Sequence, residues 1–138
     1  MSNAIIRRIY ETRLKTWADA QTPVLKIAFE NVGFMPASMA FLRGFLLPAN
    51  TDSQDLQGLH REYLGLYQID VVRPAGEGAG AAEAIVAQLE ALFPLNLRLS
   101  LSGLTVQITR PLAVSAAVVD PDRYAIPCRV TYRADLIP

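Results

Sequence analysis

The sequence has little of the side-chain chemistry on which most enzymes and metalloproteins depend. It contains one cysteine and one histidine among 138 residues. A single cysteine excludes an intramolecular disulfide and any metal site built from several cysteines. A catalytic nucleophile needs a base beside it, yet His60 follows a polar segment and Cys128 alternates with apolar residues. We therefore predict that the chain is not an enzyme and has no cofactor and no metal.

The sequence also lacks an excess of either charge and a long apolar run. Its 13 basic residues balance 13 acidic ones, which argues against binding of nucleic acid through neutralised phosphates. No stretch approaches the roughly 18 apolar residues of a membrane span. The first residues contain no apolar run that is long enough for a signal peptide. We expect a soluble protein made in the cytoplasm, with neither nucleic acid nor a membrane as its partner.

What the sequence does contain is typical of one folded domain rich in arginine. Hydrophobic residues make up 51% of the chain and charged residues 19%, so we predict a single domain over residues 1–138. Eleven of the 13 basic residues are arginine. Arginine is the basic residue that is enriched at protein interfaces, although a GC-rich genome produces the same excess. The bias therefore favours protein partners only mildly.

Periodicity predicts two helices and a sheet. Apolar residues recur at helical spacing over 4–20 and 81–93, and Ser2 or Asn3 is the expected cap of the first helix. Strand-like segments are 24–29, 39–47, 61–73, 97–101, 104–110, 113–119 and 124–133. The last segment alternates most cleanly, and Pro127 within it predicts an edge strand or a bulge. We predict an α+β domain with both amphipathic helices on one face of a mostly antiparallel sheet of about six strands, the other face being polar.

Two connections of this predicted fold could carry function. Pro48 to His60 is polar and rich in turn residues, which predicts a long exposed loop. The glycine-rich turn Gly76 to Gly80, with Ala81 after it, loosely fits the dinucleotide-binding fingerprint. The preceding strand does not begin a βαβ series, however, and no acidic residue follows about twenty residues later, where Arg98 stands between two leucines. We interpret this stretch as a strand-to-helix turn, with a small-molecule or nucleotide-binding module as the alternative function.

An ordered series of short segments carries a resemblance to a known family. The segments are 14–18 (LKTWA), 29–36 (FENVGFMP), 46–49 (LLPA), 65–71 (GLYQIDV), 74–78 (PAGEG), 92–94 (LFP), 106–110 (VQITR) and 122–130 (DRYAIPCRV). Over nearly the whole chain, the series resembles the tail-terminator-like proteins of long-tailed bacteriophages and prophages. These are minor tail proteins that cap a finished tail tube.

The resemblance implies a structural virion protein assembled in the host bacterial cytoplasm. It implies a six-fold ring of identical subunits on the last ring of the major tail-tube protein. Such a ring stops tube polymerisation and presents a surface to the head-completion protein. A different head–tail connector or neck protein of similar α+β construction is the alternative within phage particles.

The family brings no fixed interface motif, so candidate contact residues come from charge and polarity. One of them, Arg13, projects into the apolar arc of the first helix, where it is either a side chain at the rim of the core or a contact between subunits. The others lie in the predicted loop or on outward-facing strand positions. The full set is Arg13, Arg43, Asn50, Asp52, Gln54, Asp55, His60, Arg129 and Arg133.

Overall fold

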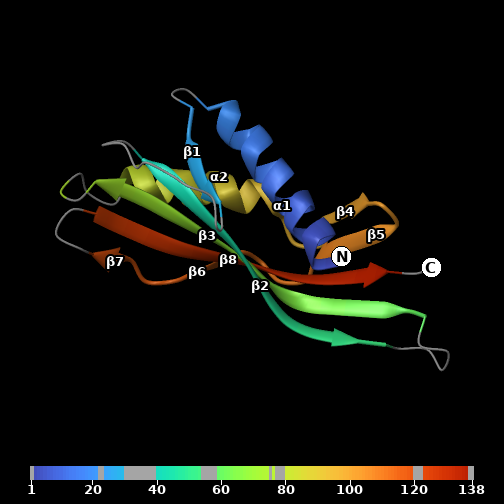
Figure 1. Ribbon diagram of the computed structural model, residues 1–138. Coiled ribbons are helices and arrows are strands. Elements are labelled where there is room, and N and C mark those ends of the chain that lie inside the picture. Colours follow the sequence, from blue (N-terminus) through green and yellow to red (C-terminus); the bar gives the residue numbers. More distant parts are fainter. Residues whose placement is uncertain are drawn as a thin grey trace.

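The computed structural model describes residues 2–21, 24–29, 40–53, 59–74, 76, 80–119 and 123–136. These residues form two helices and a sheet (Figure 1). The elements are α1 (Ser2–Asp19), β1 (Lys26–Phe29), β2 (Phe41–Asp52), β3 (Arg61–Pro74), α2 (Gly80–Leu92), β4 (Arg98–Leu101), β5 (Leu104–Ile108), β6 (Ala113–Val114), β7 (Val118–Val119) and β8 (Arg123–Leu136).

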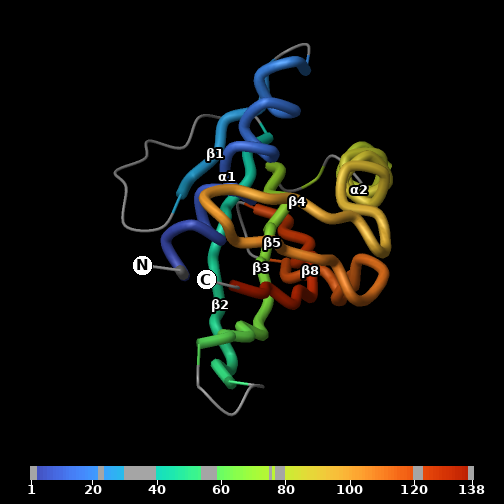
Figure 2. The backbone as a smooth tube through the Cα atoms, turned by 90° about the vertical axis from the view of Figure 1, so that its right-hand side faces the viewer, coloured from blue at the N-terminus to red at the C-terminus, as the bar shows by residue number. Residues whose placement is uncertain are grey.

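The sheet has six main strands in the order β1-β2-β3-β8-β5-β4, and the short strands β6 and β7 pair with β8. Only β1 and β2 are parallel among these pairs. Helix α1 contacts both β1 and β4, the two ends of the main order. Because one helix reaches both ends, the sheet is curled around it, as the view along the strands shows (Figure 2).

Both helices pack on the same face of the sheet, around a cluster of aromatic rings. Tyr10 of α1 is fully buried and stacks on Tyr67 of β3, with the ring centroids 5.1 Å apart. Tyr132 of β8 and Phe93, just after α2, each lie 5.8 Å from the same ring. One core therefore joins both helices to the central strands, which confirms the predicted α+β domain with helices on one face.

Local sequence signals explain the turn of the β4–β5 hairpin but not the start of the first helix. The β4–β5 hairpin turns at Ser102 and Gly103, which both have positive φ, 52° and 81°. Two such residues are what a tight two-residue hairpin requires. The predicted cap of the first helix is wrong, because α1 already includes Ser2 and Asn3. Helix formation begins earlier than the polar residues suggested.

The predicted loop from Pro48 to His60 is shorter than expected. Strand β2 continues to Asp52 and stays paired with β3, with one register shift between Pro48 and Asn50. A proline in an edge position costs no ladder hydrogen bond when its nitrogen faces away from the neighbouring strand. The polar composition from Pro48 onward therefore includes the exposed end of a strand.

The prediction that Pro127 marks an edge strand is wrong, because β8 lies between β3 and β5 in the centre of the sheet. The Pro127 carbonyl accepts a hydrogen bond from the Ser115 backbone nitrogen, so its missing donor points to the same side. On that side, residues 115–117 interrupt the pairing between β6 and β7 and oppose only two residues of β8. The sheet thus accommodates the proline at a local irregularity, which the bulge alternative anticipated.

The sheet face opposite the helices, called the open face below, is only partly polar. Phe41, Val72 and Ala125 form a small buried apolar cluster at one end of it. At the other end, Leu47 is 42% exposed. The expected polar face is therefore wrong for these positions, since β2 and β3 carry apolar side chains on both faces. Neither described helix is long and apolar enough to cross a membrane.

Candidate functional site

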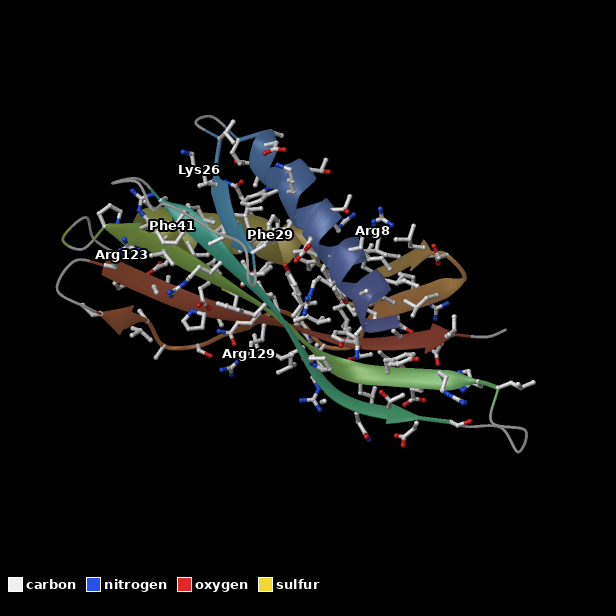
Figure 3. All side chains as sticks on the ribbon, in the orientation of Figure 1. Arg8, Lys26, Phe29, Phe41, Arg123 and Arg129 are labelled. Carbon is white, nitrogen blue, oxygen red and sulfur yellow. The ribbon has the colours of Figure 1, made fainter. Side chains whose placement is uncertain are left out.

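Three of the predicted contact residues share the open face. Arg43 lies opposite Asp70 on β3, and Arg129 lies opposite Gln68. Arg133 follows four residues after Arg129, which by strand alternation places both on the same face. Figure 3 shows Arg129 projecting from the sheet on the side away from α1. The period-two pattern of the sequence correctly predicted that Arg129 and Arg133 share a face, and the structure adds Arg43 to it.

A chain of polar contacts crosses the middle of the open face. Arg43 pairs with Asp70 at 3.4 Å, and the Gln68 side-chain amide donates a hydrogen bond to the other Asp70 oxygen at 2.9 Å. The Arg129 Nε in turn donates to the Gln68 amide oxygen at 3.4 Å. The Asp70 carboxylate is buried, whereas Arg129 is exposed at the end of the chain. Arg129 can therefore meet a partner without leaving a buried charge unpaired.

A second, tighter cluster lies where β3 begins and β8 ends. Arg133 contacts the buried Glu62 carboxylate at 3.1 Å and Asp135 at 3.2 Å. His60 reaches Asp135 at 2.9 Å. The hydrogen bonds to Asp135 raise the pKa of the Arg133 guanidinium above its usual value. Arg133 and His60 therefore have a structural role, because their contacts hold the start of β3 against the end of β8.

Arg13 lies on the helical side of the molecule, far from the other candidates in the fold. Its Nε donates a hydrogen bond to the Leu92 carbonyl oxygen at 2.9 Å, and its guanidinium carbon lies 6.0 Å from the centre of the Phe93 ring. A cation at the last turn of a helix satisfies a free carbonyl and interacts favourably with the helix dipole. Arg13 therefore joins α1 to the end of α2, in agreement with the rim-of-core alternative.

The remaining candidates belong to the end of the β2–β3 pair, which we call the arm (residues 47–52 and 61–66). Asn50 and Asp52 are exposed on β2, and the Asn50 amide donates to the Asp52 carboxylate at 3.1 Å. In Figure 1 the two strands extend together away from the helices. Gln54 and Asp55 lie outside the described residues.

The structure adds a surface that sequence reasoning did not identify, a groove of about 800 Å³ between α1 and the β4 strand. Residues from both elements and from the end of α2 line it. Among them are Arg8, Ile9, Arg13, Trp17, Leu99 and Leu101. The apolar side of the first helix was the available signal in the sequence. Nothing in the sequence indicated that part of this side, including Trp17, lines a groove in addition to covering the core.

Metal binding and thiol chemistry find no support in the part of the chain that the structure describes. No group of three histidine, cysteine or acidic residues in the described ranges could hold a metal ion. Cys128 is buried, and burial raises the pKa of its thiol to about 11, so the reactive thiolate is scarce at neutral pH. In the glycine-rich turn, Gly76 has a positive φ of 88°, while positions 77–79 lie outside the described residues. The dinucleotide-binding alternative stays a prediction from the sequence.

Comparison with known proteins identifies the family. Residues 5–132 match the family described as phage tail terminator protein. The chain belongs to this family. One solved structure is similar at 38% sequence identity, covering 100% of this chain and 99% of the other, with a TM-score of 0.85. No curated protein sequence matches the chain.

Membership in the phage tail terminator family confirms the resemblance found in the sequence. The family is structural and non-enzymatic, which confirms the prediction that the chain is not an enzyme. Membership implies a phage tail protein that interacts with the tail tube.

Proposed function

We propose that this protein forms a six-fold ring on the last ring of tail-tube subunits, stops tube polymerisation and presents the surface to which the head-completion protein binds. The match to the tail terminator family over residues 5–132 carries this proposal. In this function the protein is part of the virion tail and assembles in the host bacterial cytoplasm. Its partners are copies of itself, the major tail-tube protein and a head-completion protein.

The distribution of surface features supports a ring. A ring of identical subunits uses head-to-tail contacts, which need two different and complementary patches on each subunit. The chain carries apolar and charged features on two separate sides: the open face with the arm, and the groove beside α1. Its balanced charge suits contact with proteins.

The candidate contact residues differ in how directly they can test the proposal. Arg133 pairs with buried Glu62, so replacing it with glutamate would place two carboxylates together and damage the fold. Deleting residues 50–58 would remove the end of β2. Arg129 is exposed and only weakly bonded, so Arg129→Glu changes a surface and leaves the core intact.

The decisive experiment compares phage particles that lack this protein with particles restored by a plasmid copy. We expect overlong tails without heads in its absence, and normal particles after restoration. Tails of normal length attached to heads would refute the proposal. Headless tails of normal length would indicate the neck-protein alternative, because head joining would then fail without loss of length control.

A pair of variants tests the role of the open face in the same assay. Arg129→Glu should reduce the fraction of capped tails, whereas Arg110→Glu makes the same charge change at an exposed position between β5 and β6. Circular dichroism of both purified proteins checks that the fold is retained. Equal capping by the two variants would remove Arg129 from the contact surface.

A further inference from the structure

The groove beside α1 combines apolar walls with a cationic rim. Trp17, Leu99 and Leu101 supply apolar surface from two different elements. Arg8 is exposed at the rim, and Arg13 lies in the wall. None of the groove's described lining residues carries a carboxylate. A complementary partner surface would therefore be apolar and acidic.

The arm of this chain has that complementary character. On its open-face side, strand register places Leu47 opposite Leu66, and Asn50 opposite Leu64. Leu47 is 42% exposed, and Asp52 is exposed at the end of the same row. The arm therefore carries a row of apolar side chains that ends at the Asp52 carboxylate.

The charge of the arm's end also matches the groove. The described residues of the arm carry two carboxylates, those of Asp52 and Glu62, against one guanidinium group, that of Arg61. This leaves one net negative charge on the described residues of the arm. The groove carries two arginines and no acid, so the two surfaces have opposite charge.

We propose that the arm of one subunit docks in the α1 groove of the next subunit, with the row of leucines on the apolar walls and Asp52 toward Arg8. The inference rests on the proposed ring and specifies its subunit contact. The two patches are different surfaces of one chain, so the contact is head-to-tail and can repeat around a ring. Opposite charges at the rim set the orientation of the arm and increase the rate of encounter.

Cross-linking between two singly substituted proteins tests this contact directly. Thr16→Cys places a thiol in the groove, and Asn50→Cys places one on the arm, both at exposed positions. The native Cys128 is buried, so unmodified protein gives the background. The two variants are mixed on isolated tail tubes, treated with a short bismaleimide and separated by denaturing electrophoresis. Electron microscopy of the same samples records whether rings are present.

We expect cross-linked dimers from the mixture of Thr16→Cys and Asn50→Cys, and background levels from either variant alone. The matched control replaces the groove thiol with Gln88→Cys, at an exposed position on α2, and should also give background levels. A chain that carries both Thr16→Cys and Asn50→Cys should give a ladder of multimers.

Charge reversal provides a second measurement on the intact protein. We expect Arg8→Glu or Asp52→Arg alone to weaken ring formation about tenfold, and the two changes combined in one chain to restore it. Failure of the combined variant to recover, together with absent cross-links, would overturn the contact.

The outcomes separate this contact from the proposed function. Rings seen by microscopy without cross-links refute the arm-in-groove contact and leave tube capping standing. Cross-links without any effect on tubes support the contact and refute the capping function. Cross-links from Thr16→Cys to the tube protein in place of a second copy show that another partner occupies the groove, which also refutes the contact. Absence of any association in solution or on tubes refutes both proposals.

Discussion

Two glycines in the sheet make room for buried tyrosine hydroxyls, and they give a sharp test of how the core is packed. A Cβ atom at Gly44 would lie 2.5 Å from the Tyr67 hydroxyl oxygen, but 3.3 Å from the ring carbon that carries it. Tyr67 cannot move away easily, because its ring is stacked on Tyr10. Gly44→Ala should therefore overpack the core and destabilise the folded state. Alanine also lowers the conformational entropy of the unfolded chain, which offsets part of this loss of stability. The net loss of unfolding free energy should be about 1–2 kcal/mol.

Removing the hydroxyl should relieve most of this cost. In a Tyr67→Phe background the nearest atom to the new methyl group is the ring carbon at 3.3 Å, a distance that small adjustments accommodate. Gly44→Ala should then cost less than about 0.5 kcal/mol, which gives a coupling energy of at least about 0.5 kcal/mol between the two positions. Urea titrations followed by the fluorescence of Trp17, the single tryptophan, measure all four proteins.

Gly65 provides the matched control for this cycle. A Cβ atom there would lie 2.5 Å from the Tyr132 hydroxyl, but also 2.8 Å from the Leu47 backbone oxygen and 2.8 Å from the ring carbon. Tyr132→Phe therefore should not rescue Gly65→Ala. Equal destabilisation by Gly44→Ala with and without the Tyr67 hydroxyl, or equal rescue at both glycines, would refute this account of the packing.

Three further predictions concern stability. Arg13→Met keeps the apolar stem but loses the hydrogen bond to the α2 carbonyl, and should lower the urea unfolding free energy by about 1 kcal/mol. Arg133→Ala should lower it by more, about 3 kcal/mol, because the buried Glu62 carboxylate loses its contact with the Arg133 guanidinium; a thermal melt that leaves the midpoint unchanged would contradict this. Burial raises the pKa of Cys128 from 9.0 to about 11 and that of Tyr132 from 10.0 to about 12. The folded state therefore holds these protons to higher pH than the unfolded state, so stability should fall as pH rises from about 9 toward 12. Cys128→Ala should flatten the lower part of that fall.

The sequence predicted the class of fold because its strong signals are local. Alternation along β8 and helical spacing in α1 depend only on neighbouring residues. The position of β8 in the sheet depends on which strands pair with it. Pro127 led to the wrong position, because the sheet accommodates its missing backbone donor at an irregularity between β6 and β7. Pairing partners therefore could not be read from the strand itself.

The candidate contact residues show the same limit. Alternation correctly placed Arg129 and Arg133 on one face, but it could not distinguish a weakly bonded arginine from one that neutralises a buried acid. That difference depends on Glu62, which lies 71 positions earlier in the sequence. The groove was missed for a related reason, since its walls come from α1 and β4, which meet only in the folded chain.

Because β8 lies in the centre of the sheet, its position in the sequence determines when the chain can complete its fold. Strand β8 pairs with β3, β5, β6 and β7, and it is the last described element along the chain. A ribosome must therefore deliver residues 123–136 before the two halves of the sheet can join. Until then β3 and β5 present unpaired edges, which favour degradation or aggregation over correct assembly. An incompletely synthesised chain therefore cannot form the complete sheet that carries the open face.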